Sequence, residues 1–443
     1  MKTNAIQSIT VALLMAATTG LAGAQGVRYT IETDRAVLPA GAPENTVLKI
    51  TLTAPEAPPE TARTPVNLCI VLDRSGSMSG GKIEHAREAA IEAIRRLHPD
   101  DIVSLVTYDS QIETVIPAQH PRHVEWMEEQ IRRITPRGMT ALFGGVSQGA
   151  SEIRKHEDGH YIKRMILLSD GIANVGPSQP AELARLGASL AKEEIQVSTV
   201  GLGLDYNEDL MTALAQQSGG NVYFVEHSAD LPRILTAELG DAQQVVVRQV
   251  IVQINLPDHV QPVRIIGRDG RITRNQIEIP INHLQGGQSR FALVEVQVAP
   301  QAPQAVIELA RARVSYEDLA TQQRVTSGDQ GVSVSFSEET AAVEASINTE
   351  VERDLLANRL AIAQDDAIRL ADEGRPAEAA AVLREVAVDY DLVGARDGDA
   401  TLQRRAQEIQ GSAERVESVG MDRRDRKQFR ADSFQVIQQQ DVP

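Results

Sequence analysis

The stretch VLDRSGSMSGGKI, residues 71–83, contains residue types that could bind a cation. Asp73 ends a hydrophobic run, and Ser75 and Ser77 follow at spacings of two residues. In an extended loop, side chains two residues apart point the same way, so one carboxylate and two hydroxyls would converge. Such hard oxygen ligands suit Mg²⁺ or Mn²⁺ and are poor ligands for zinc. Alone the segment is a weak signal, because a serine-rich loop with an aspartate is usually a turn that caps a helix.

Phosphate binding is the alternative for the same loop. Residues 76–82 read G-x-x-x-x-G-K, and the run MILLSD, which ends at Asp170, is similar to the acidic strand of a nucleotide-binding site. A phosphate-binding loop needs a Ser or Thr hydroxyl for magnesium directly after its lysine. Ile83 occupies that position after Lys82, and Asp73 would repel phosphates. The sequence therefore argues against nucleotide binding.

The elements that must position these residues lie between residues 66 and 240. Short apolar runs alternate there with amphipathic stretches, and the runs are VNLCIVL, DIVSLVTY, KRMILLS, EIQVSTVGLG and NVYFVE. Strands that alternate with helices predict a doubly wound α/β domain with a mostly parallel sheet. Ligands bind such sheets at the carboxyl ends of the strands, where Asp73 and Asp170 both fall. Cys69, the only cysteine, lies inside the first run and is expected to be buried without a disulfide.

Residues 66–240 resemble the von Willebrand factor type A (vWA) family. The D-x-S-x-S pattern at Asp73 is similar to the metal-ion-dependent adhesion site of that family, which also expects a threonine after a glycine-containing loop and an aspartate after the next core strand. This chain has Thr140 in PRGMTALFGGV and Asp170 in LLSDG. One departure is Met139, because a second glycine is common before the threonine.

The resemblance implies a Rossmann-like fold and a complete metal site. Its ligands would be Asp73, Ser75, Ser77, Thr140 and Asp170. The ion would be Mg²⁺, with Mn²⁺ or Ca²⁺ possible. If the direct ligands are neutral hydroxyls, the ion keeps positive charge, and its open position would accept a Glu or Asp carboxylate from a partner protein. The resemblance implies no catalytic residue and no organic cofactor.

The rest of the chain divides into further regions. Residues 1–24 have the order of a secretory signal peptide. Residues 25–65 carry alternating strands that could share one sheet with 241–340, a predicted antiparallel β-sandwich, so that the α/β domain would be an insertion. Residues 345–420 show helical period, a tetratricopeptide-like helix pair with Pro376 opening the second helix and then one more helix. Residues 421–443 are a basic, then Gln-rich tail that could be a surface helix, a docking segment or disordered.

Composition narrows the classes of function. The chain has 443 residues, a formal net charge of -17 and 42% hydrophobic residues. So acidic a chain is a poor general binder of nucleic acid. After residue 24 no segment is apolar enough to cross a bilayer. The mature chain is therefore expected to be exported, and to be periplasmic, secreted or on the cell surface.

These observations predict a non-enzymatic, exported protein for adhesion or for the assembly of protein complexes. The order of domains is similar to bacterial proteins described as calcium-activated chloride channel-like, although no channel is implied. One alternative is an envelope assembly or maturation factor. Another is a metal-dependent hydrolase, but the sequence has no G-x-S-x-G elbow and no zinc helix motif.

Overall fold

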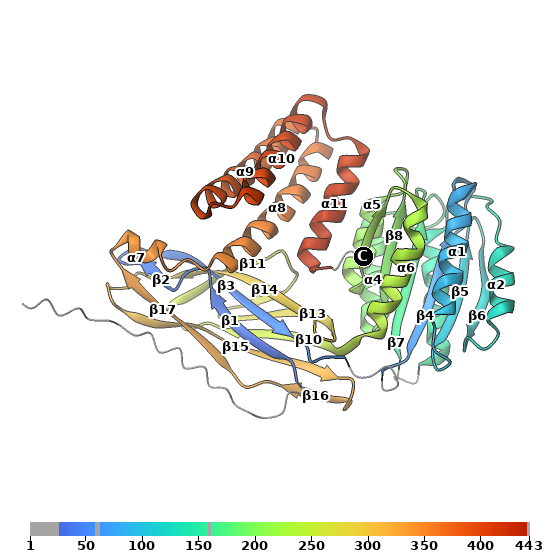
Figure 1. Ribbon diagram of the computed structural model, residues 1–443, viewed down its shortest axis with the longest axis horizontal. Helices are drawn as coiled ribbons and strands as arrows, with labels where there is room; N and C mark the ends of the chain where they lie inside the picture. Colours follow the sequence, from blue (N-terminus) through green and yellow to red (C-terminus); the bar gives the residue numbers. More distant parts are fainter. Residues whose placement is uncertain (1–25, 58–62, 158–160, 441–443) are drawn as a thin grey trace, which may run out of the picture.

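The structure, a computed structural model, describes residues 26–57, 63–157 and 161–440. The predicted signal peptide lies outside the described residues. The chain folds into an α/β domain, a β-sandwich and a helical region, which lie side by side in Figure 1. This confirms the predicted fold class. Among the described residues no helix is both long and apolar enough to cross a membrane.

The α/β domain is built on a six-stranded sheet. Its strand order is β6-β5-β4-β7-β8-β9, and all neighbouring strands are parallel except β5 and β6. Every residue of β4 is buried, as expected of a strand covered on both faces. The strands are β4 (Val66–Asp73), β5 (Ile102–Tyr108), β6 (Ile112–Gln119), β7 (Ile162–Ser169), β8 (Gln196–Leu202) and β9 (Val222–Val225).

Helices cover both faces of this sheet with two hydrophobic cores. One core joins it to α1, α2 and α6, and the other joins it to α3, α4 and α5. Cys69 lies in the second core, and burial raises the pKa of its thiol to about 12. The helices are α1 (Gly81–Arg95), α2 (Val124–Arg132), α3 (Leu142–Ile153), α4 (Pro180–Lys192), α5 (Glu208–Ser218) and α6 (Leu231–Gln243), with short 3₁₀ turns η2 (Gly76–Met78), η3 (Arg154–His156) and η4 (Ser228–Asp230).

The β-sandwich is assembled from strands on both sides of the α/β domain. One sheet has the order β1-β3-β14-β11, and the other has the order β12-β13-β10-β15-β17-β2 with β16 paired to β15. The α/β domain is thus inserted between β3 and β10. The strands are β1 (Arg28–Thr33), β2 (Val37–Pro39), β3 (Glu44–Thr53), β10 (Val245–Asn255), β11 (Val260–Ile266), β12 (Arg271–Thr273), β13 (Gln276–Gln285), β14 (Ser289–Val298), β15 (Val306–Asp318), β16 (Gln323–Thr326) and β17 (Gln330–Ser337).

The helical region packs on the outer face of the four-stranded sheet. Lys49 of β3 is buried there and forms ion pairs with Glu350 and Asp354, both at 2.6 Å. The long helices share their own hydrophobic core. The helices are α7 (Thr340–Glu344), α8 (Thr349–Asp372), α9 (Pro376–Asp397), α10 (Ala400–Val419) and α11 (Arg423–Gln438).

Residues 423–438 of the tail form helix α11, which packs against other parts of the chain. The sequence alone did not distinguish a surface helix, a docking segment and disorder for this tail. Helix α11 lies between α8 and the α/β domain, where Phe434 packs with Ala215 and Val222. Lys427 is buried and donates to the carbonyl of Tyr206 at 2.9 Å, and it also pairs with Glu208. The last residues, 441–443, for which disorder is expected, lie outside the described residues.

Two helical glycines give a test of the packing of the α/β domain. A Cβ at Gly187 of α4 would lie 2.6 Å from the carbonyl oxygen of Leu214 in α5, whereas a Cβ at Gly240 of α6 would meet nothing within 4 Å. We expect Gly187→Ala to lower the free energy of unfolding by about 1–3 kcal/mol, because α5 must move away. Gly240→Ala should raise it by about 0.5–1 kcal/mol through helix propensity. Urea unfolding followed by the fluorescence of Trp126, the only tryptophan, measures both. Equal effects of the two substitutions would contradict this account.

Candidate metal site

Two buried aspartates end adjacent strands at one edge of the central sheet. Asp73 is the last residue of β4, and Asp170 directly follows β7. The two strands are parallel neighbours, so their carboxyl ends meet. Neither aspartate has exposed surface. The sheet order therefore brings together two residues that are 97 positions apart in the sequence.

Hydrogen bonds connect the D-x-S-x-S loop to Asp170. The backbone N–H of Ser75 donates to Asp73 Oδ1 at 2.8 Å. The hydroxyl oxygens of Ser75 and Ser77 lie 2.9 Å apart, and Ser77 donates to Asp170 Oδ1 at 2.7 Å. Ser77 is exposed, whereas Ser75 is buried. Four of the five predicted ligands thus form one hydrogen-bonded group that reaches the surface at Ser77.

Thr140 approaches the same group from a third loop. A Cβ added at Gly171 would lie 3.3 Å from Thr140 Oγ1 and 3.4 Å from Ser77 Oγ. The two hydroxyl oxygens therefore both lie close to Gly171, which directly follows Asp170. Asn174 fixes Thr140, since its side-chain oxygen accepts from the backbone N–H of Thr140 at 2.8 Å. Asn174 was not predicted, because nothing in the sequence indicates which residue after Asp170 contacts the loop that carries Thr140.

The loop that carries Thr140 is joined to the D-x-S-x-S loop by backbone and ionic contacts. The N–H of Arg137 donates to the carbonyl of Arg74 at 2.7 Å, and the N–H of Gly76 donates to the carbonyl of Gly138 at 3.2 Å. Both arginines also pair with the buried Asp109, at 2.8 and 2.9 Å. This support was missed in the sequence, because Asp109 lies in a loop with no recognisable pattern.

The environment of Asp73 shapes its charge. Burial raises the pKa of Asp73 to about 6, and the neighbouring charge of Asp170 acts in the same direction. Ser169 partly offsets this by donating to Asp73 Oδ2 at 2.8 Å. A cation beside the two carboxylates would favour their ionised forms. Protonation of Asp73 and the binding of a cation beside it would therefore oppose each other.

Lys82 and Ile83 take different places from those of a phosphate-binding loop. Lys82 donates to Asp170 Oδ2 at 2.6 Å, so its ammonium pairs with a carboxylate. Ile83 is buried in the hydrophobic core under α1. This arrangement supports the sequence-based argument against nucleotide binding.

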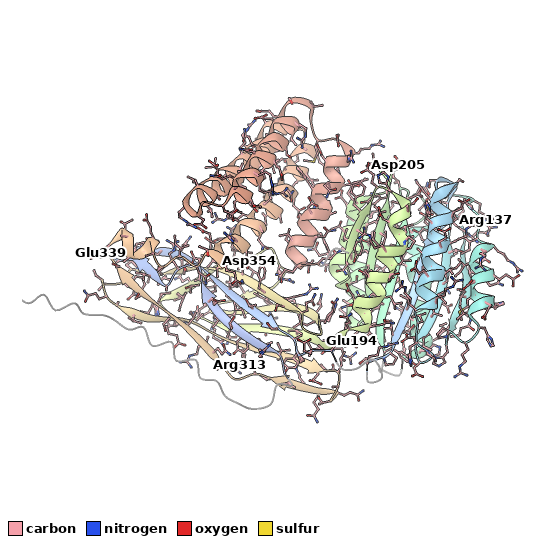
Figure 2. All side chains as sticks on the ribbon, viewed as in Figure 1. Arg137, Glu194, Asp205, Arg313, Glu339 and Asp354 are labelled. Carbon is pink, nitrogen blue, oxygen red and sulfur yellow. The ribbon has the colours of Figure 1, made fainter. Side chains whose placement is uncertain are left out.

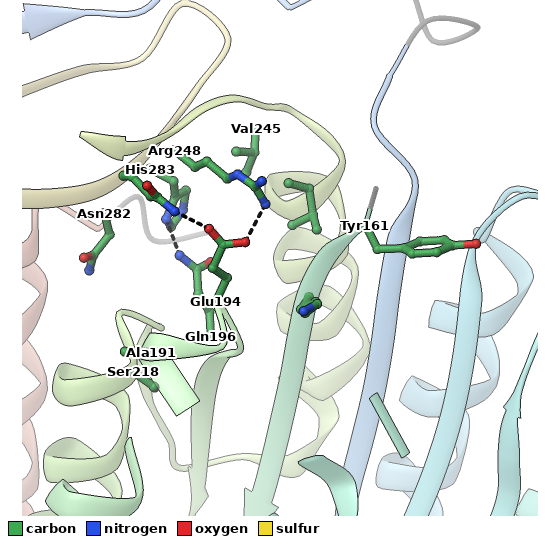
Figure 3. A pocket seen from close by; sticks show the side chains of 12 residues that line it. Tyr161, Ala191, Glu194, Gln196, Ser218, Val245, Arg248, Asn282 and His283 are labelled. Atoms are coloured by element: carbon green, nitrogen blue, oxygen red, sulfur yellow. Dashed lines mark hydrogen bonds and ion pairs between the residues drawn. The ribbon is translucent and has the colours of Figure 1, made fainter. Parts of the chain in front are cut away.

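A partly open cavity of about 110 Å³ lies elsewhere, at the junction of the α/β domain and the sandwich. Figure 3 shows Glu194 at this cavity with a hydrogen bond from Arg248. Glu194 also accepts a hydrogen bond from Gln249. Figure 2 places Glu194 at the lower end of the α/β domain and Asp205, in the loop after β8, at the upper end. The candidate metal site lies at the ends of β4 and β7, the same edge as the end of β8, and is therefore separate from the cavity.

The residues present are suitable ligands for a hard divalent cation. Hydroxyl and carboxylate oxygens are the ligand types that Mg²⁺ takes in proteins. Thr140 and Ser77 place two such hydroxyl oxygens close to Gly171, the residue after Asp170. Within the described residues, no cluster of three or more His, Cys, Asp or Glu side chains forms an alternative metal site.

Known proteins match parts or most of this chain. The family model of the von Willebrand factor type A domain matches residues 67–237. A curated protein of Synechocystis sp., "Uncharacterized protein sll0103", is 31% identical over 193 residues, which are 44% of this chain and 45% of that protein. The chain spans less than half the length of the first curated relatives that it matches.

Two solved structures match this chain over most of its length. The structure described as von Willebrand factor type A from Catenulispora acidiphila has a TM-score of 0.70 and 18% identity, and the match covers 93% of this chain and 97% of that one. The ArnB paralog VWA2 from Sulfolobus acidocaldarius has a TM-score of 0.59 and 16% identity, with 93% and 98% covered. At these identities the likeness concerns the fold. With the family match and the sheet order, it shows that residues 67–237 of this chain form a von Willebrand factor type A domain.

Proposed function

We propose that this chain is an exported, non-enzymatic binding protein whose vWA domain holds a divalent cation and captures a Glu or Asp carboxylate of a partner protein. The proposed ion is Mg²⁺, with Mn²⁺ and Ca²⁺ as alternatives. Its proposed ligands are Asp73, Ser75, Ser77, Thr140 and Asp170. Export rests on the signal-like sequence of residues 1–24, which lie outside the described residues.

One observation carries this proposal. Hydroxyl oxygens from two separate loops both lie close to Gly171, at the edge where two buried carboxylates lie at the ends of their strands. Neutral hydroxyls leave a bound Mg²⁺ with uncompensated positive charge, so a further ligand with a negative oxygen is favoured. Domains of this family typically mediate protein–protein interactions, which agrees with a protein as the source of that oxygen.

The surroundings of the site also favour a protein partner. Met139 precedes Thr140 and is 48% exposed, and Ile172, two residues after Asp170, is 61% exposed. Apolar side chains at the surface beside a charged anchor are typical of the central part of a protein interface. A partner with apolar groups next to its acidic residue would bury the side chains of Met139 and Ile172.

Removal of one hydroxyl tests the metal site. Thr140→Val keeps the shape of the side chain and removes Oγ1, so we expect the affinity for Mg²⁺ to fall about tenfold or more, because a lost ligand is replaced only by water. Titration calorimetry with MgCl₂ measures this. Thr135→Val is the matched control, since Thr135 is exposed in the same loop and should bind like the wild type. If Thr140→Val bound Mg²⁺ as tightly as the wild type, the assignment of Thr140 would be wrong.

Capture of a partner tests the function itself. The chain without residues 1–24 is immobilised and exposed to an envelope extract in Mg²⁺ and in EDTA. We expect a protein that is retained in Mg²⁺ and released by EDTA, because the ion links the two partners. Asp170→Ala should not retain it and Thr140→Val should retain less of it, whereas Thr135→Val should retain as much as the wild type. A protein retained by all variants and in EDTA would place binding on the sandwich or helical region.

The charge of Asp73 gives a pH test in the metal-free state. Its pKa is raised from 3.8 to about 6 by burial, so between these values the folded chain holds a proton that the unfolded chain has released. The free energy of unfolding in EDTA should therefore fall as pH rises from 4 to 6, by about 3 kcal/mol at most. Asp73→Asn removes this part of the slope, which urea unfolding at several pH values measures. At pH 7, Mg²⁺ should stabilise the wild type and not this variant.

A further inference from the structure

Lys82 forms a contact with the candidate site that its proposed ligands do not account for. Its Nζ lies 2.6 Å from Asp170 Oδ2, while Asp170 Oδ1 accepts from Ser77. Asp170 is fully buried, and the side chain of Lys82 is one-third exposed. The ammonium is therefore fixed by the carboxylate at one side and open to solvent at another.

No other cation of the described residues contacts Asp73 or Asp170. The nearby Arg74 and Arg137 both pair with Asp109 and lie within reach of Glu113 as well. Lys82 thus supplies the only positive charge among the described residues that contacts one of the two buried carboxylates, that of Asp170. A cation placed among these oxygens would face the ammonium across Asp170.

We propose that Lys82 adjusts two affinities of this site. Its ammonium competes with the divalent cation for Asp170, and it adds a second positive charge that favours an anionic partner group. This inference rests on the proposed function and names a residue that acts beside the metal ligands. Lys82 lowers the affinity of the free chain for Mg²⁺. It raises the affinity of the metal-loaded chain for a carboxylate.

The geometry allows both roles. The lysine stem has four carbons and is flexible, so its ammonium can leave Asp170 without movement of the backbone. Across from it, a Cβ at Gly203 in the loop after β8 would lie 3.9 Å from Nζ, so this loop passes close to the ammonium. Leu204 follows and is exposed, which places the ammonium beside the surface that a partner would cover.

Electrostatics gives the sign of each effect. Like charges a few ångström apart in a partly buried site repel, so replacing Lys82 by a neutral residue should strengthen the binding of Mg²⁺. The same charge attracts a carboxylate, so its loss should weaken the partner's binding. A residue that only supported the fold would weaken both.

Calorimetric titration with MgCl₂ tests the first effect. We expect Lys82→Met to bind Mg²⁺ about tenfold more tightly than the wild type. Lys82→Arg, which keeps the charge, and Lys192→Met, which removes an exposed charge at the end of α4, should bind like the wild type. Equal or weaker binding by Lys82→Met with an unchanged circular dichroism spectrum would overturn the proposal, as would tighter binding by Lys82→Arg.

A short peptide with one glutamate and blocked ends tests the second effect at saturating Mg²⁺. We expect Lys82→Met to bind this peptide several-fold more weakly than the wild type and Lys192→Met to bind it equally. Equal binding by Lys82→Met would overturn this part. Failure of the proposed function is distinguishable, because then neither the wild type nor Lys82→Met would bind Mg²⁺. Where the wild type binds Mg²⁺ and Lys82→Met binds it no better, only the role of Lys82 fails.

Discussion

The burial of two carboxylates at the ends of neighbouring parallel strands is the constraint on which the site depends. Charges without exposed surface are costly unless paired or hydrogen-bonded. Asp73 is met by Ser75 and Ser169, and Asp170 by Ser77 and Lys82. The contact of Ser75 with Asp73 is local, but the other three require β4 to lie beside β7, since that order brings the two loops together. The sheet order thus fixes the chemistry of the edge.

The insertion of the α/β domain decides where this edge points. The chain enters β4 from the sandwich and returns to it through α6 and β10, so both connections lie at the opposite edge. Helix α11 adds a lateral support, because Lys427 and Arg426 pair with Glu208 at the start of α5. The sandwich is therefore joined to the α/β domain at the end of the sheet opposite the candidate site, and helix α11 contacts the domain at one side. The carboxyl ends of β4 and β7 are left facing away from the sandwich.

The sequence predicts the parts of this fold that obey local patterns. Strands β4 and β7 are continuous apolar runs because helices cover both of their faces, and these runs locate Asp73 and Asp170. Strand β6 was missed, since it is an edge strand with a single buried residue, Ile116, and is interrupted by Pro117. Helix α11 was ambiguous because charged contacts with other domains hold it. Lys82 and Ser169 have roles that depend on sheet order, which spacing alone does not give.

The contacts among the side chains of the candidate site affect how a ligand would be bound. Ser75, Ser77, Asp170 and Lys82 form a continuous series of contacts, and Asn174 holds Thr140 in place. A preformed site does not lose conformational freedom when a ligand arrives, so less of the binding free energy is spent on ordering. The same contacts must be exchanged, however, since a cation displaces hydrogen bonds among its ligands. The affinity for a cation then depends on the difference in free energy between the site with its internal hydrogen bonds and the site with the cation bound. One charged side chain, Lys82, can change this difference without altering the fold.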